Sequence, residues 1–599
     1  MASSVKTLLA CSLLALCSVR AAPSSDAQTH GRNSASTAAG VAGPTVTVKN
    51  GTLEGLYSTE YDQDFFLGIR YAEPAQRFEL AQPLNSSFDG TQSAKAYGPS
   101  CVGYGTDDYG YPLSEDCLYL NVIRPAGLNA TASLPVALWI HGGGLYEGGS
   151  SDKRYNLSFL VEDAVELGTP IVGVSINYRL SAYGFLAGRE ALAAGVANNG
   201  FRDQRQALRW VNENIAAFGG DPAKVTIWGE SAGAESVFAQ VMAYDGRDDG
   251  LFRAAVAESG FGGTLARYAG GFNATAAMQD TYNLLVSNTS CAATANTSAS
   301  LDCLRALPLS ELNAALNGTA AGPWPPMLDG DLIADYPHNV LARGQFPRIP
   351  VLIGCNTDEG TAFGTAKGPN GAAIGSDADM RYAVEQTIGP DAPAVLNRTM
   401  DAIVDEALAL YPDIQAVGIP SLDKFEAIQP GSAYAEELGL QYRRGAAYFG
   451  DYVMHFLRRR ANIAWHNAGL PSYSYRFDVT VNGIPDYVAA THFQEVAFVF
   501  DNTRGEGYNF QADPFANESA AFPALAKAMS TAWINFFVSL DPNGADDSVA
   551  AWPVYNTSVG GGVGQNMVWD VNGSHVEWDS YRAEGIEWMM ASGLTVFGN

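Results

Sequence analysis

Positive charge is scarce in this 599-residue chain. Lysine and arginine number 35 against 63 aspartate and glutamate residues, so the net charge is −28 at pH 7. A chain this acidic repels phosphate backbones and anionic membrane surfaces, which argues against nucleic-acid binding. Charged residues make up only 16% of the chain and hydrophobic residues 47%. That balance predicts a globular protein with a large core rather than a disordered chain.

Long hydrophobic runs are missing after the N-terminus. No later segment has 18 or more uninterrupted apolar residues, and the last residues lack the tail of a lipid-anchor signal, so we expect no stable membrane anchor. At the start, Lys6 precedes an apolar run over residues 8–19, and Arg20-Ala21-Ala22-Pro23 follows. This layout predicts a signal peptide over residues 1–21 and a secreted, extracellular protein. Residues 22–43, rich in Ser, Ala, Thr and Gly, predict a disordered leader.

Cysteine is also sparse. Of seven cysteines, two lie in the predicted signal peptide, which leaves an odd number in the mature chain. Cys355 ends an apolar run, so it is interpreted as a small buried hydrophobic residue without chemistry. The other four fall into two pairs that are close in sequence and predict short-loop disulfides in an oxidising compartment: Cys101–Cys117 and Cys291–Cys303.

Sites for N-glycosylation are numerous, which fits a eukaryotic secreted glycoprotein. Each is an asparagine followed two positions later by serine or threonine. The twelve are Asn50, Asn85, Asn129, Asn156, Asn273, Asn288, Asn296, Asn317, Asn397, Asn517, Asn556 and Asn572.

The order of apolar segments predicts the α/β class. Alternating residues around Asn50-Gly51 predict a β-hairpin, and strands are expected at residues 118–123, 134–140, 170–177, 225–228, 349–353 and 473–479. Between Asp203 and Phe218, apolar residues recur every three or four positions and predict a helix. Strands separated by helices favour one parallel α/β sheet over two unrelated domains. Residues 292–300 predict an exposed, glycosylated loop.

Two glycine motifs carry the chemistry. Gly229-Glu230-Ser231-Ala232-Gly233 follows a short strand and precedes a helix, the context of a nucleophile elbow, so Ser231 is the candidate nucleophile. His141-Gly142-Gly143-Gly144 follows the strand at 134–140, and glycines let backbone N–H groups approach an oxyanion. The pair, in this order, predicts an acyl-transfer enzyme.

The base is found by elimination, because this hydrolase arrangement runs serine, acid, histidine along the chain. Of the histidines after Ser231, only His492 follows the last clear strand by a loop and can reach the carboxyl ends of the sheet. The others lie in a proline-flanked segment, in or near a helix, or after a sequon: His338, His455, His466 and His575. For the acid, Asp358 and Glu359 both follow the strand at 349–353, and the residues alone do not choose between them.

The sequence strongly resembles the type-B carboxylesterase/lipase family, which includes cholinesterases and fungal lipases. The signature around the nucleophile is FGGDPAKVTIWGESAG at residues 218–233, and a second is EDCLYLNVIRP at residues 115–125. The resemblance covers nearly the whole mature chain. It implies one domain over residues 44–599 with the α/β-hydrolase fold, a large mixed, mostly parallel central sheet flanked by helices.

The resemblance also implies site residues. Glu359 becomes the triad acid, since it aligns in Asp-Glu-Gly, and His492 the base, in agreement with the elimination above. The oxyanion donors are the N–H groups of Gly143, Gly144 and Ala232, and the family's two loop disulfides coincide with the cysteine pairs. Ser259 resembles a serine that lies near the triad, and a packing role is an equal alternative.

Departures from the family concern the substrate. Only fifteen residues separate Cys101 from Cys117, without the tryptophan that cholinesterases use for choline and without the length of a lipase lid. Leu145 replaces the usual aromatic residue after the glycines. We expect a serine carboxylesterase acting on a small-molecule ester. The alternatives are a lipase for longer-chain acylglycerols or sterol esters, a cholinesterase-like enzyme and a non-catalytic adhesion member. No metal or cofactor motif accompanies the site, and the oligomeric state stays open.

Overall fold

A computed structural model describes residues 43–129, 131–262, 268–318, 322–363, 368–544 and 550–599. The predicted signal peptide and all but the last residue of the predicted leader lie outside these ranges. Within them, no helix combines the length and the apolar composition needed to cross a membrane.

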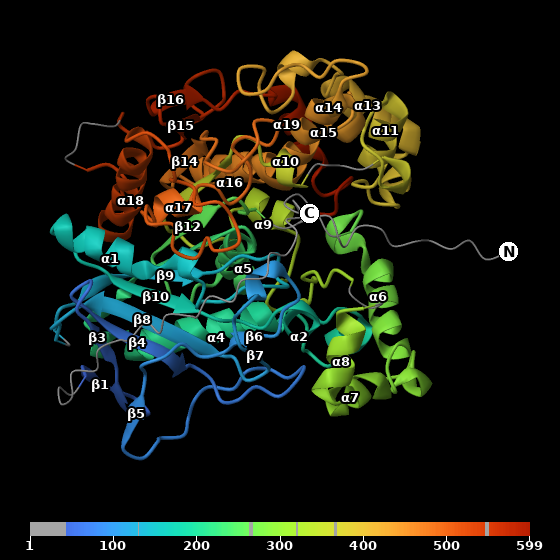
Figure 1. The fold of residues 1–599 in the computed structure, drawn as a ribbon. Coiled ribbons are helices and arrows are strands. Elements are labelled where there is room, and N and C mark those ends of the chain that lie inside the picture. The colour runs from blue at the N-terminus through green and yellow to red at the C-terminus, as the bar shows by residue number, and fades with distance from the viewer. Residues whose placement is uncertain (1–42, 130, 263–267, 319–321, 364–367, 545–549) are drawn as a thin grey trace, which may run out of the picture.

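The core of the molecule is an eleven-stranded mixed sheet (Figure 1). Its seven middle strands are parallel, and the strands at both edges are antiparallel to their neighbours. In spatial order the strands are β16(His575–Trp578), β15(Gln565–Trp569), β14(Ser472–Phe477), β13(Val351–Asn356), β12(Ala254–Glu258), β11(Gly220–Glu230), β9(Leu134–Ile140), β10(Val172–Ile176), β8(Tyr119–Pro125), β4(Gln63–Arg70) and β3(Leu56–Ser58).

Both faces of the sheet are covered by helices. Successive side chains of a strand point to opposite faces, so they join two different hydrophobic cores. In β9, Leu138 and Ile140 join one core, whereas Ala137 and Trp139 join the other. The first core is closed by α4(Asn199–Asn214), α5(Ala232–Gly246) and α16(Phe456–Asn467). The second is closed by α1(Leu157–Glu166), α17(Val496–Val499) and α18(Ala521–Ser539). The mixed, mostly parallel sheet with flanking helices is confirmed.

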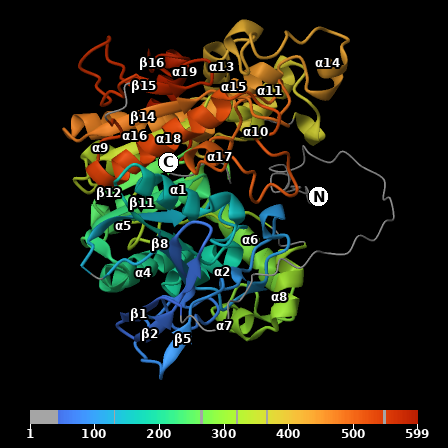
Figure 2. The same cartoon turned by 60° about the vertical axis from the view of Figure 1, so that its left-hand side comes forward.

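Two helical groups are inserted after strands of the sheet. One follows β12 and contains α6(Thr275–Ser287), α7(Ala299–Ala306), α8(Leu309–Leu316) and α9(Pro337–Arg343). The other follows β13 and contains α10(Gly360–Phe363), α11(Asp377–Glu385), α12(Ala392–Leu396), α13(Met400–Leu410), α14(Ala433–Glu437) and α15(Tyr442–Gly450). Figures 1 and 2 both place α11, α13, α14 and α15 above α6, α7 and α8 on the same side of the molecule. Because parallel strands end at one edge, both insertions begin at the edge where β11 delivers Ser231.

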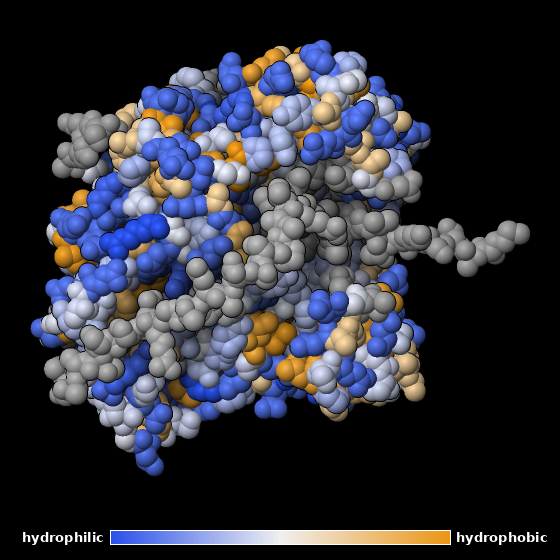
Figure 3. All heavy atoms as spheres, in the orientation of Figure 1, coloured by the Kyte–Doolittle hydropathy of each residue, from blue (hydrophilic) through white to orange (hydrophobic). Residues whose placement is uncertain are grey.

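Smaller elements complete the fold. The predicted hairpin is formed by β1(Thr45–Val48) and β2(Gly51–Glu54), and β5(Thr91–Ser93) pairs with it. The remaining elements are β6(Ser100–Cys101), β7(Leu113–Ser114), α2(Ser181–Phe185), α3(Arg189–Ala193) and α19(Ala583–Ser592). On the face shown in Figure 3, hydrophilic residues are interspersed with small hydrophobic areas.

The elements that the sequence predicts differ from the structure mainly at their ends. The helix expected at 203–218 begins earlier, at Asn199, and its last turn is the 3₁₀ segment Ile215–Phe218. The loop expected at 292–300 contains the 3₁₀ turn Ala292–Thr294 and the start of α7. Both disulfides are formed as paired, and Cys355 is free and buried.

Candidate active site

Ser231 occupies a strained turn between β11 and α5. Its backbone has φ 58° and ψ −123°, a conformation that a non-glycine residue adopts only when its surroundings enforce it. The Ser231 N–H donates to the carbonyl of Glu258 over 2.8 Å. A Cβ atom at Gly233 would lie 2.0 Å from the Ile140 carbonyl oxygen, so only glycine lets the helix start this close to β9. The turn therefore projects Ser231 from the carboxyl end of the central strand.

The glycine loop, residues 141–148, follows β9 and lies against this turn. A Cβ atom at Gly142 would be 3.1 Å from Cβ of Ser231. Within the described part of the chain, the N–H groups of Gly143, Gly144 and Ala232 donate no hydrogen bond. Unpaired N–H groups are rare in protein interiors, and Ala232 is buried. Two of these unused donors follow Gly142 in the loop that touches Ser231, and the third directly follows Ser231, an arrangement suited to binding an oxyanion.

Two adjacent carboxyl groups after β13 point in different directions. Glu359 Oε2 lies 2.8 Å from Nδ1 of His492. Asp358 instead accepts from Lys424 Nζ over 3.0 Å and from the Ala490 N–H over 3.1 Å. The structure thus brings Glu359, and not Asp358, to the histidine.

The other ring nitrogen of His492 faces the turn that carries Ser231. Its Nε2 lies 3.1 Å from Oε1 of Glu230, the residue directly before Ser231. No hydrogen bond joins Ser231 to His492 among the residues described. The Phe363 ring packs against the imidazole in a T-shaped arrangement, with ring centroids 4.5 Å apart. The ring is thus held between Glu359 on one side and the Ser231 turn on the other.

Further acidic side chains surround this pair, and the sequence interpretation did not single them out. Glu230 and Glu495 are fully or almost fully buried. Burial first, and the neighbouring glutamates second, raise the pKa of Glu230 well above its ordinary value and that of Glu495 to about 7. Glu495 lies three residues after His492, and only the fold brings it close to Glu359.

Ser259 and Asn356 connect these carboxyl groups. The Ser259 hydroxyl donates to Glu359 Oε1 over 2.5 Å and lies 3.2 Å from Glu495 Oε1. The Asn356 side chain donates to Glu495 over 2.5 Å, and its N–H donates to Glu359 over 2.9 Å. Of the two roles left open for Ser259, the contact with Glu359 favours the one beside the acid.

The remaining histidines have other partners. His455 lies in the π-helical segment Asp451–His455, with Nδ1 3.0 Å from Cys355 Sγ and from the Tyr581 hydroxyl. Burial, and then the nearby arginines, hold the pKa of His455 well below its ordinary value. His338, His466 and His575 contact Arg460, Ser558 and the Gly573 carbonyl, respectively. In the described ranges, no group of three or more histidine, cysteine or acidic residues could hold a metal ion.

The sheet and the turn at Ser231 define an α/β-hydrolase, and the comparisons with known proteins agree. The structure superposes on the crystal structure of Aspergillus niger EstA with a TM-score of 0.75 and 26% identity, covering 93% of this chain and 99% of that one. Lipase 2 of Diutina rugosa is 33% identical over 574 residues, covering 90% of this chain and 93% of that protein. Secreted lipase 1 of Botryotinia fuckeliana is 32% identical, with 86% and 88% covered.

The sequence model of the carboxylesterase family matches residues 42–563, and the chain belongs to that family. It is a carboxylic ester hydrolase. The resemblance identified from the motifs is therefore confirmed, and the alternative of a non-catalytic adhesion protein is set aside.

Proposed function

We propose that this carboxylesterase works through an acyl-enzyme on Ser231, with His492 as the general base and Glu359 as the residue that orients it. The observation that carries the proposal is the 2.8 Å contact between Glu359 and His492 Nδ1, made beside a strained turn bearing a serine. A carboxyl group on Nδ1 fixes the tautomer in which Nε2 is free to accept a proton.

Acylation follows from this arrangement. The Ser231 oxygen bonds to the ester carbonyl carbon while its proton passes to His492 Nε2. The carbonyl oxygen gains the electron pair, and the N–H groups of Gly143, Gly144 and Ala232 donate to it. When the tetrahedral intermediate collapses, the C–O bond to the alcohol breaks and the alcohol leaves with the proton held by His492.

Deacylation repeats the sequence with water. His492 accepts a proton from water as its oxygen bonds to the acyl carbon, and the same three N–H groups stabilise the second oxyanion. Collapse returns the proton to Ser231 and releases the carboxylic acid. Burial raises the pKa of Glu230 well above its ordinary value, which favours the neutral form of this carboxyl group over a second negative charge beside His492.

We further propose that the substrates are soluble esters with short acyl chains. The Cys101–Cys117 segment carries only the 3₁₀ turn Thr106–Asp108 and the two-residue strands β6 and β7, and it contains no tryptophan. It therefore provides neither a long helical lid nor the tryptophan with which cholinesterases stack on choline. A cation–π contact is worth about 0.5–2 kcal/mol, so choline esters should gain no such advantage here.

A panel of p-nitrophenyl esters with rising acyl length tests both parts. We expect hydrolysis of the short esters by the wild-type protein and its loss, by several orders of magnitude, in folded Ser231→Ala. Full activity in that variant would exclude Ser231 as the nucleophile.

A lipase is the second candidate, because the curated relatives include fungal lipases. Tributyrin measured across its solubility limit separates the two: a smooth rise in rate supports the esterase, and a jump when droplets form supports the lipase. Butyrylcholine against a neutral isostere tests the cholinesterase-like alternative in the same assay.

Secretion and N-glycosylation belong to this proposal as well. Supporting them are the signal-peptide pattern, the two disulfides and the relative whose name includes secretion. One domain over residues 44–599 is proposed on the continuity of the eleven-stranded sheet from β3 to β16.

A further inference from the structure

The disulfide loop between Cys101 and Cys117 is joined to the glycine loop by two buried carboxyl groups, one from each loop. Asp108, in the disulfide loop, accepts the N–H of Gly148 over 3.0 Å. Glu147, in the glycine loop, accepts the N–H of Asp107 over 2.9 Å. Each loop thus supplies one carboxyl group to the backbone of the other. We name Asp108, Glu147 and these two hydrogen bonds the carboxyl clasp.

The clasp is built into the interior. Asp108 is 8% exposed and Glu147 only 2%. A Cβ atom at Gly105 would lie 1.6 Å from Glu147 Oε2, so the disulfide loop carries a glycine where the carboxyl group lies. A buried carboxyl group is costly unless its oxygens are hydrogen-bonded, which makes this arrangement a specific one.

Glu147 also touches the backbone that carries the proposed oxyanion donors. A Cβ atom at Gly143 would be 2.2 Å from the Glu147 carbonyl oxygen and 3.1 Å from its Cγ. Gly143, Gly144 and Leu145 have successive positive φ angles of 90°, 61° and 63°. Three such residues in a row do not hold their shape by themselves, and contacts with neighbouring segments must supply the constraint.

The disulfide loop has a further attachment beside the proposed base. Asp107 pairs with Arg154 over 2.7 Å. The Arg154 guanidinium lies 4.8 Å from the ring centroid of Phe493, the residue after His492. The same short loop is therefore fixed both to the glycine loop and to the chain next to His492.

We propose that Asp108 and Glu147 are positioning residues of the oxyanion hole: they hold the strained glycine loop so that the Gly143 and Gly144 N–H groups stay in place to donate to the oxyanion formed at Ser231. Neither touches the substrate. This inference rests on the proposed function, because it assumes the oxyanion hole. Catalysis by such donors depends on their being fixed before the reaction begins.

The test compares variants of the full-length secreted protein with a soluble p-nitrophenyl ester and a trifluoromethyl ketone, which forms a tetrahedral adduct with a nucleophilic serine. We expect Glu147→Ala and Asp108→Ala each to lower kcat about 10- to 100-fold with KM changed less than about threefold. The inhibition constant of the ketone should rise in parallel with the loss of kcat. Glu147→Gln, which retains an acceptor oxygen, should recover most of the activity.

The matched control is Asp116→Asn, since Asp116 lies in the same disulfide loop but pairs with Arg70. It should leave kcat and the ketone affinity near wild type. If Glu147→Ala does not fold, Glu147→Asp takes its place. Aspartate keeps an ionisable carboxyl group, but its shorter side chain moves that group away from the Asp107 N–H.

Folded Ala or Asp variants with kcat within twofold of wild type would overturn the inference, and so would a change confined to KM. Failure of the proposed function is distinguishable: there, Ser231→Ala itself retains activity. If Ser231 is essential and the clasp variants behave as wild type, only the clasp is wrong.

Discussion

Two neighbouring acidic residues, Asp358 and Glu359, have separate tasks although both are completely buried. Glu359 faces His492, whereas Asp358 pairs with Lys424. The residues after the strand made both candidates, and the choice depends on a lysine 66 positions further along the chain. The residues around Asp358 do not show that it pairs with a lysine so far along the chain, so the resemblance to a family was needed to select Glu359.

The pair offers a matched comparison. Glu359→Gln should lower kcat by about 10²- to 10⁴-fold, because the amide no longer orients the imidazole in the productive tautomer. Asp358→Asn removes an equally buried carboxyl group and should lower stability by breaking the contact with Lys424, with kcat changed less than about tenfold. Steady-state kinetics together with urea unfolding of both variants provides the check. Equal losses of kcat would contradict the division of roles.

The clasp carboxyl groups also predict a pH dependence of stability. Burial raises the pKa of Asp108 to about 6 and, together with the Asp107 charge, that of Glu147 to about 7. The folded state therefore holds these protons more tightly than the unfolded chain, and both groups lower stability as pH rises from about 4 to 7.

Glu147→Gln removes one of the two titrations. As pH rises from 4.5 to 8, the wild type should lose on the order of 2 kcal/mol more unfolding free energy than this variant does. Urea unfolding at a series of pH values measures the difference. Parallel pH profiles for the two proteins would show that Glu147 does not titrate in this range.

Among the secondary-structure elements, strands with continuous apolar runs can be predicted from the sequence, whereas strands without such runs are missed. Residues 134–140 form β9 as predicted, because both faces of a central parallel strand are buried. β12, Ala254–Glu258, was missed, since its residues AAVAE are mostly alanine and end in glutamate. Its strand conformation depends on parallel pairing with β11 and β13, which lie far away in the sequence.

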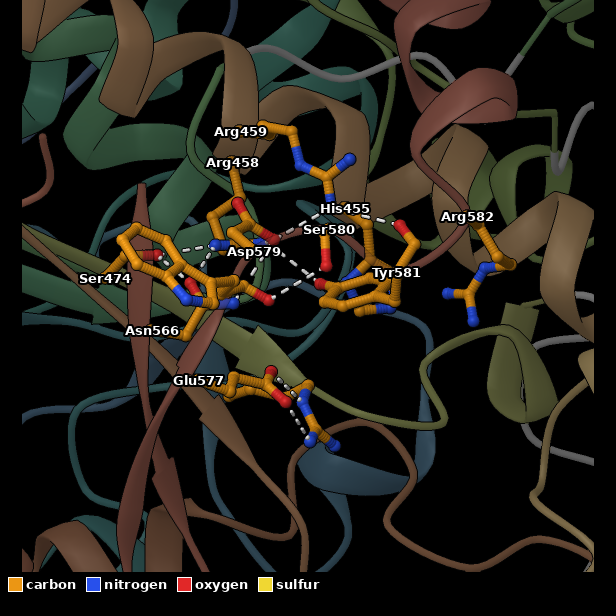
Figure 4. A network of polar contacts seen from close by, with 12 residues as sticks. His455, Arg458, Arg459, Ser474, Asn566, Glu577, Asp579, Ser580, Tyr581 and Arg582 are labelled. Atoms are coloured by element: carbon orange, nitrogen blue, oxygen red, sulfur yellow. Dashed lines mark hydrogen bonds and ion pairs between the residues drawn. The ribbon is translucent and has the colours of Figure 1, made fainter. Parts of the chain in front are cut away.

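A buried ion network joins α16 to the far strands of the sheet. Figure 4 shows Asp579 between Arg458 and Arg459, with contacts of 2.7 and 2.8 Å. Arg458 also donates to Ser474 of β14 and Asn566 of β15. Burial alone would raise the pKa of Asp579, but the two guanidinium groups outweigh it and hold that pKa well below its ordinary value.

Asp579→Asn should therefore destabilise the protein by about 3–5 kcal/mol, because it leaves two buried arginines without their charge partner. The wild-type contribution should disappear as pH falls into the acid range, since the Asp579 pKa is lowered. Glu577→Gln is the control: its pair with Arg476 is more exposed, and the loss should stay near 0–1 kcal/mol. Thermal unfolding distinguishes the two, and equal changes would contradict the ranking.

At the scale of the whole molecule, the fold sorts the twelve sequons. Asn50 is only 3% exposed, and its Nδ2 donates to the carbonyls of Leu84 and Ser86. Asn156 is half-buried and donates to Glu506. The other ten asparagines are exposed. A sequence pattern shows where a glycan can be recognised, and only the tertiary structure shows whether the amide is accessible.

Peptide mapping of the protein produced in a eukaryotic secretory host should therefore find Asn50 without a glycan and glycans only among the exposed sites. A glycan on Asn50 would replace a hydrogen that its Nδ2 uses inside the protein, so the glycosylated chain could not close this region. A glycopeptide that contains modified Asn50, recovered from folded active enzyme, would contradict the placement of the segment.

Active-site labelling shows whether the enzyme forms a covalent intermediate on Ser231. The wild-type enzyme is inactivated with a p-nitrophenyl phosphonate, and the labelled peptide is identified by mass. We expect one phosphonyl group per chain, located on Ser231, with loss of activity proportional to labelling, and no label at this position in Ser231→Ala. Complete inactivation with Ser231 unmodified would contradict it.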